Sequence, residues 1–168
     1  MDCYEKLVNE KAKNKRALLG SMFFPRTPVV FVDFSSAKIF SAHKEILEGL
    51  DAIGATALAV IPAAAKKLPK LQYIHYMPAN DNEKIQSALA AADIAIIFEH
   101  AMPEMRLAGC VPVSLYHGKD TVNFNPLQEK GNGFYFKSPT TWEAFAATVR
   151  ALETYQFPYD WENVVSEA

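Results

Sequence analysis

The sequence predicts an α/β protein with a doubly wound, mostly parallel sheet. Three observations support this fold class: short apolar runs that read as strands buried on both faces, segments of helical periodicity between them, and the regular alternation of the two along the chain. Strands that are apolar on both faces need helices on each side, and a doubly wound sheet provides them. We find no internal repeat and no low-complexity tract, so one domain over 1–168 is expected.

The elements follow one another in a regular order. A leading helix is expected over 1–20, an α/β core over 27–136 and closing helices over 140–168. The predicted strands are 27–34, 55–61, 71–77, 93–98, 110–116 and 133–136, and the predicted helices within or after the core are 42–54, 83–92, a short one at 103–109, and 140–155. The apolar face of the helix at 140–155 is expected to hold Trp142, Phe145, Val149 and Leu152.

Composition excludes several classes of protein. The chain of 168 residues is 50% hydrophobic and has a formal net charge of -2, so it offers no basic field for nucleic acid or anionic lipid. Cys3 and Cys110 lie far apart, which removes the ligands for a disulfide framework or a zinc ribbon. No apolar run approaches the length of about 18 residues that a membrane span needs. We expect a protein of the reducing cytoplasm that binds neither nucleic acid nor a membrane.

Candidate site residues gather where the predicted strands end. In open parallel sheets, ligands bind beyond the carboxyl ends of the strands, near the N-termini of the following helices. Polar residues in these positions are Ser36 and Lys38 after the first strand, Glu99, His100 and Glu104 after the fourth, and Gly118, Asp120 and Thr121 after the fifth. Polar loops are also common in any doubly wound domain, so ordinary loop composition stays an alternative explanation.

Motifs for other chemistries are missing from the sequence. His100 and Glu104 have helical spacing, but Pro103 lies between them and no second His stands at ligand spacing, so we predict no metal site. No GxGxxG, GxxxxGK[ST] or GxSxG motif occurs, which disfavours classical dinucleotide, P-loop and nucleophile-elbow chemistry. The aromatic segment "FPYDW" (157–161) is interpreted as the start of a packed closing helix rather than a platform for stacking bases.

Six segments in the correct order resemble the C-terminal, donor-binding half of bacterial glycogen synthases and plant starch synthases. They are "EKAKNKRALL" (10–19), "IQSALAAADIAIIF" (85–98), "EMRLAGCVPV" (104–113), "DTV" (120–122), "GNGFYF" (131–136) and "ALETYQFPYDWENVVSEA" (151–168). The resemblance implies a Rossmann-like lobe of a GT-B glycosyltransferase with ADP-glucose or UDP-glucose as donor and no further cofactor. It also implies that Gly131 and Gly133, in the polar loop "NPLQEKGNGFYF" (125–136), make the turn before the last strand, beside the donor crevice.

The resemblance also implies roles for individual residues. In the family an Arg and a Lys after the first strand hold the donor's diphosphate, and here "VDFSSAKIF" carries Phe34 at the Arg position and Lys38 at the Lys position. Glu104 matches the Glu that contacts the ribose hydroxyls. The segment Asp120, Thr121 and Val122 matches the end of the loop whose backbone faces the diphosphate, although the paired glycines before it are replaced by Tyr116 and His117, with Gly118 next to them.

These departures define the hypotheses for function. We assign no catalytic residue, and the family's acceptor lobe has no counterpart in this sequence, so the chain alone is not expected to transfer glucose. One hypothesis is a donor-binding half that binds a nucleotide or nucleotide-sugar weakly and takes an acceptor lobe as partner. The alternative is a non-catalytic regulatory or protein-interaction module that keeps the fold of the lobe. A relic without any ligand is the third reading.

Overall fold

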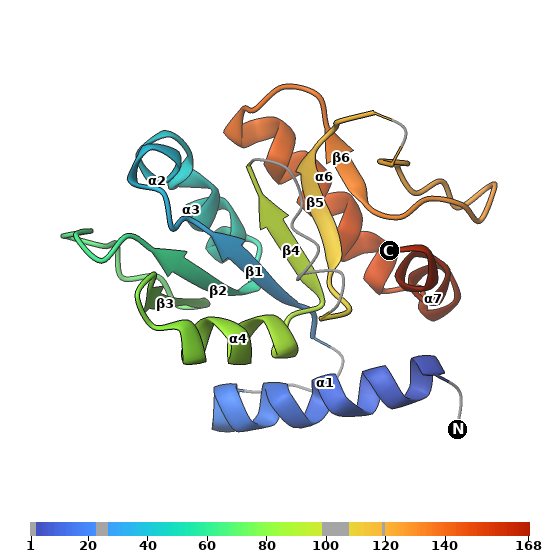
Figure 1. The fold of residues 1–168 in the computed structure, drawn as a ribbon, viewed down its shortest axis with the longest axis horizontal. Helices are drawn as coiled ribbons and strands as arrows, with labels where there is room; N and C mark the ends of the chain where they lie inside the picture. The colour runs from blue at the N-terminus through green and yellow to red at the C-terminus, as the bar shows by residue number, and fades with distance from the viewer. Residues whose placement is uncertain (1–2, 23–26, 99–107, 119) are drawn as a thin grey trace.

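The structure, a computed structural model, describes residues 3–22, 27–98, 108–118 and 120–168. Its six strands form one sheet with the order β3-β2-β1-β4-β5-β6, and every neighbouring pair is parallel (Figure 1). The strands are β1 (Val29–Asp33), β2 (Thr56–Ile61), β3 (Ile74–Pro78), β4 (Ile94–Ile97), β5 (Val111–Leu115) and β6 (Phe134–Phe136). The predicted α/β class with a doubly wound sheet is confirmed.

Helices cover both faces of this sheet. They are α1 (Cys3–Leu19) with a short 3-10 turn η1 (Gly20–Met22), α2 (Ala37–His43), α3 (Glu45–Ala52), α4 (Asn82–Ala91), α6 (Thr141–Tyr155) and α7 (Pro158–Glu167). Buried side chains of α3, α6 and α7 share one hydrophobic cluster with the sheet, whereas those of α1 and α4 belong to a second cluster on the opposite face. The two clusters explain why the strands are apolar at successive positions.

The strand β1 illustrates this rule. Its Val30 and Val32 belong to the cluster of α3 and α6, and its Val29 and Phe31 belong to the cluster of α1 and α4. Successive side chains of a strand point to opposite faces, so a strand covered on both sides reads as a continuous apolar run. The run at 27–34 was interpreted in this way, and the structure agrees.

The predicted helix at 42–54 is wrong in its extent, because the structure has two helices there, α2 and α3. Ile46, Leu47 and Leu50 of α3 are buried as the spacing suggested. Ile53, whose spacing from Ile46 and Leu50 would also place it on this apolar face, lies at the C-cap of α3 and is exposed. The helix ends there because Gly54 takes a positive φ of 71°, which an L side chain rarely adopts.

The predicted apolar face of α6 also needs a correction. Trp142 is 77% exposed, and the fully buried positions are Ala144, Ala147, Thr148 and Ala151. Small side chains let the helix approach the sheet closely. Phe145 and Leu152 pack only at the margin of the same cluster, so the bulky residues flank the contact instead of forming its centre.

The carboxyl ends of all six strands lie at one edge of the sheet, because every pairing is parallel. The segments after β1, β4, β5 and β6 therefore start from this carboxyl edge, which is where a ligand of a doubly wound protein is expected. Among the described residues, no helix is long and apolar enough to cross a membrane.

Candidate functional site

The structure places most of the predicted site residues at the carboxyl edge. Ser36 is the N-cap residue of α2 but makes no side-chain cap hydrogen bond, and Lys38 is exposed in the first turn of that helix. Gly118, Asp120, Thr121 and Val122 follow β5. Glu104 lies outside the described residues, as do Glu99 and His100.

The described site residues form two groups, one at the start of α2 and one after β5. No hydrogen bond or ion pair joins the two groups in the described part of the chain. Figure 1 shows α2 on the side of β1, whereas the loop that follows β5 runs out on the far side of β6. The strand β4 lies between β1 and β5 in the sheet. A ligand that used both Lys38 and the 120–122 backbone would have to reach across the end of β4.

The backbone at 120–122 is already held by Asn132. The amide N–H of Val122 donates to Asn132 Oδ1 at 3.0 Å, and Asn132 Nδ2 donates to the carbonyl oxygen of Asp120 at 2.9 Å. The N–H of Asn132 donates in turn to the carbonyl oxygen of Val122 at 2.9 Å. The side chain of Asn132 thus accepts from the Val122 N–H, which the family resemblance would direct towards a diphosphate.

Thr121 is also engaged within its own loop. Its N–H donates to the carbonyl oxygen of Gly118 at 3.1 Å, and its hydroxyl donates to the same oxygen at 2.8 Å. The hydroxyl accepts from the N–H of His117 at 3.3 Å, and the Thr121 side chain is buried. A phosphate could use the N–H groups of Thr121 and Val122 only after these bonds were broken, and each unmade bond carries a cost.

An aromatic cluster lies at the carboxyl ends of β1, β4 and β6, on the face of the sheet that α3 and α6 cover. We define it as Phe34, Phe40, His43, Phe98 and Phe136. Phe34 follows β1, Phe98 follows β4 and Phe136 ends β6, and all three are buried. The rings of Phe34 and Phe98 stack with centroids 5.6 Å apart, and Phe136 lies 6.1 Å from Phe98. The position where the resemblance would place a diphosphate-binding Arg is therefore held by Phe34, whose ring is packed among other aromatic side chains.

His43 closes this cluster on the side of α6. Its ring stacks on Phe98 with centroids 4.0 Å apart and an interplanar angle of 7°, and its Nδ1 lies 3.1 Å from the hydroxyl oxygen of Thr141. Burial lowers the pKa of His43 from its ordinary value, against the opposing effect of the Glu45 carboxylate. The stacked ring thus favours the neutral imidazole, which adds no positive charge for a phosphate.

The N-terminus of α6 also starts from the carboxyl edge, and it carries its own anion. Thr140 caps the helix by accepting from the N–H of Glu143 at 3.2 Å, and Glu143 Oε2 accepts from the N–H groups of Lys137 and Ser138 at 3.1 and 2.9 Å. The hydrogen bond from Ser138 is the main reason that the pKa of Glu143 is lowered. The Glu143 carboxylate therefore lies beside the N-terminus of α6, where its negative charge would repel a phosphate.

The glycines of the loop before β6 serve close packing. Gly131 has a φ of 128°, and a Cβ at this position would lie 2.4 Å from Phe124 Cα. Its N–H donates to Glu167 Oε2 at 2.8 Å. A Cβ on Gly133 would meet Pro112 and the hydroxyl of Tyr135, all at 2.8 Å. The loop before β6 therefore packs closely against Phe124, Pro112 and Tyr135 and is hydrogen-bonded to Glu167.

Sequence reasoning missed Asn132, Glu143 and the ring contacts of Phe98. A Thr three residues before a Glu is the usual signature of a capping box, so Glu143 could have been found from its spacing. Asn132 had no comparable signal, because its partners lie in a different segment of the loop. Among the described residues, no group of three or more His, Cys, Asp or Glu side chains is arranged to hold a metal ion.

Comparison with known proteins gives one partial similarity. No protein-family model matches the chain. The chain is 36% identical over 63 residues to glycogen synthase 1 of Synechocystis sp. (strain ATCC 27184 / PCC 6803 / Kazusa), and the match covers 36% of this chain and 13% of that protein. The aligned part thus spans a small fraction of the relative's length. Together with the parallel sheet, this similarity supports a glycosyltransferase-like relationship.

Proposed function

We propose that this protein is a glycogen-synthase-like domain that keeps the fold of a donor lobe but acts as a non-catalytic regulatory or protein-interaction module. The aromatic cluster carries this proposal. Three buried phenylalanines pack into the core at the carboxyl ends of β1, β4 and β6, where a nucleotide-sugar would need polar and cationic groups. A charged diphosphate placed against packed rings would lose its hydration without gaining partners.

The hydrogen bonds of Asn132 support the same proposal independently. They join the 120–122 backbone to the loop before β6, so the chain itself uses the amide of Val122. Lys38 remains as an exposed cation, and a lone exposed Lys contributes little to binding in water. The donor-binding hypothesis therefore rests on Lys38 and on Glu104, whose surroundings lie outside the described residues.

A transfer assay tests the non-catalytic part of this proposal directly. The purified chain is incubated with glycogen and radiolabelled ADP-glucose or UDP-glucose, with the Synechocystis glycogen synthase 1 as a positive control. We expect no glucan-bound label above that of heat-denatured protein. Label incorporated in proportion to the concentration of the chain would contradict the proposal. Unfolding is excluded as the cause of a negative result by recording a circular dichroism spectrum of the same sample.

A further inference from the structure

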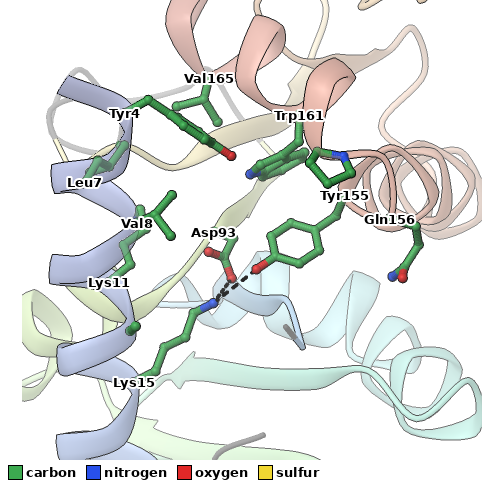
Figure 2. A pocket seen from close by; sticks show the side chains of 13 residues that line it. Tyr4, Leu7, Val8, Lys11, Lys15, Asp93, Tyr155, Gln156, Trp161 and Val165 are labelled. Atoms are coloured by element: carbon green, nitrogen blue, oxygen red, sulfur yellow. Dashed lines mark hydrogen bonds and ion pairs between the residues drawn. The ribbon is translucent and has the colours of Figure 1, made fainter. Parts of the chain in front are cut away.

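A cavity of about 650 Å³ lies at the opposite, amino edge of the sheet, between α1 and α7 (Figure 2). Its volume is within the range of small-molecule sites, about 300–1,000 Å³. Apolar and aromatic side chains form two facing walls, with Tyr4, Leu7 and Val8 from α1 and Pro158, Trp161 and Val165 from the region of α7. None of the residues named for the carboxyl edge lines this cavity.

The polar groups of the cavity meet at the ammonium of Lys15. Lys15 Nζ lies 2.6 Å from Asp93 Oδ2 and 3.5 Å from the hydroxyl oxygen of Tyr155, as Figure 2 shows. Both charged side chains are only 6% exposed. Asp93 comes just before β4, and its Oδ2 also accepts from the N–H of Val29 at 2.8 Å, which fixes the carboxylate at the amino ends of β1 and β4.

Some hydrogen-bonding capacity of these groups is unused within the described chain. Both contacts found for the Asp93 carboxylate use Oδ2, which leaves Oδ1 as an acceptor. Tyr155 accepts from Lys15 at 3.5 Å, and the hydrogen bonds among the described residues include none that its own O–H donates. Burial raises the pKa of Tyr155, with a smaller effect of Asp93, so this phenol stays protonated and is a donor. A donor and an acceptor therefore face the cavity from neighbouring groups.

The charges around the cavity favour a neutral ligand. Lys15 is balanced by Asp93. Lys11, one turn earlier on α1, donates to the carbonyl oxygens of Ala92 and Ala108, which satisfies its ammonium. The negative charge of Glu162 acts on Tyr4 at the wall. A carboxylate ligand would meet Asp93 and Glu162, and an ammonium ligand would meet two lysines, so either one would be desolvated beside a like charge.

We propose that this cavity binds a small, uncharged ligand with an apolar body and a hydroxyl group. The body would lie between the aromatic and aliphatic walls. The hydroxyl would donate to Asp93 Oδ1 and accept from Tyr155, because a hydroxyl is both a donor and an acceptor. This inference goes beyond the proposed function and does not depend on the carboxyl edge, so a failed nucleotide experiment leaves it intact.

Matched probes test the head group. We would use 1-adamantylmethanol, its methyl ether, 1-adamantanecarboxylate and 1-adamantylmethylammonium, which share one apolar body. Trp161 lies in the cavity wall and Trp142 is exposed, so fluorescence is read in a Trp142→Phe background in which Trp161 is the remaining indole. We expect saturable binding of the alcohol. The two charged probes should bind at least about tenfold more weakly, and the ether about fivefold, because it cannot donate to Asp93.

Variants locate the site. Ala12 lines the cavity, whereas Ala17 is exposed on the same helix, so Ala12→Phe should block the cavity and Ala17→Phe serves as the matched control. We expect Ala12→Phe to abolish binding of the alcohol and Ala17→Phe to preserve it. Tyr155→Phe should weaken the alcohol about fivefold. Circular dichroism and urea unfolding show whether each variant is folded.

Four outcomes would overturn the inference. They are no response of the folded parent to about 1 mM alcohol, equal affinity for neutral and charged probes, binding that survives Ala12→Phe, and a dimer of the parent that Ala12→Phe dissociates in light scattering. The last outcome would identify the occupant of the cavity as a second copy of the chain.

Discussion

The buried ion pair between Lys15 and Asp93 should be a main support of the fold at α1. Its two side chains are 6% exposed and their charged atoms are 2.6 Å apart. Removing one partner of such a pair leaves an uncompensated buried charge, which typically costs about 3–5 kcal/mol. We expect Lys15→Met to lower the free energy of unfolding by about 3 kcal/mol or more, since Asp93 would keep only its bond from the Val29 N–H.

The pair between Lys84 and Asp81 is a matched control within the same protein. Its charged atoms are 2.9 Å apart, but the side chains are 64% and 30% exposed. Lys84→Met is the same substitution and also lies in a helix, so the change in helix propensity nearly cancels. Because solvent and salt screen this pair, the urea midpoint of Lys84→Met should stay near that of the parent.

Urea unfolding followed by circular dichroism measures both variants. The double variant Lys15→Met/Asp93→Asn should recover part of the loss, because it leaves no unpaired charge and an Asn can still accept from Val29. Equal midpoints for Lys15→Met and Lys84→Met would refute the reasoning. A double variant no more stable than Lys15→Met would refute it as well.

Three further results are expected. Gly131→Ala should lower the free energy of unfolding by about 3 kcal/mol or more, and Gly118→Ala should lower it by less. Both glycines have a positive φ, but a Cβ would clash with Phe124 only at Gly131. Equal urea midpoints of the two variants would contradict the clash. Asn132→Ala should cost about 1–2 kcal/mol in the same assay through its lost hydrogen bonds, and an unchanged midpoint would show that they contribute nothing. Ellman's reagent should label exposed Cys3 rapidly in the native protein and Cys110 only after unfolding, since burial raises the pKa of the Cys110 thiol to about 11. Rapid reaction of two thiols in the native protein would contradict this.

The sheet could be predicted from the sequence because its strands are marked locally. Each core strand is a short apolar run with helical periodicity on either side, and Val29 to Val32 show why both faces are apolar. The ends of the helices and strands were harder to predict. The break between α2 and α3 has no Gly or Pro to mark it, and Lys44 joins the two helices without a side-chain cap.

The contacts that define the edges of the sheet depend on residues distant in sequence. Lys11 and Lys15 look like solvated charges in the pattern of α1, yet both are buried, because Ala92 and Asp93 supply partners from the start of β4. Phe34 was recognised as a departure from the family's Arg. That Phe98 and Phe136 would stack around it could not be seen, because ring packing depends on strands that are adjacent only in the folded sheet.

A nucleotide titration followed by two-dimensional NMR of the nitrogen-15 protein tests the closed carboxyl edge most directly. ADP, UDP and ADP-glucose are added to the parent, to Lys38→Ala and to the control Lys13→Ala, whose exposed Lys is on α1. We predict no saturable shifts at residues 36–38 and 120–122 up to about 5 mM, which means a binding free energy weaker than about 3 kcal/mol. Saturable shifts clustered at these residues, weakened by Lys38→Ala and not by Lys13→Ala, would contradict the account and show a working donor site.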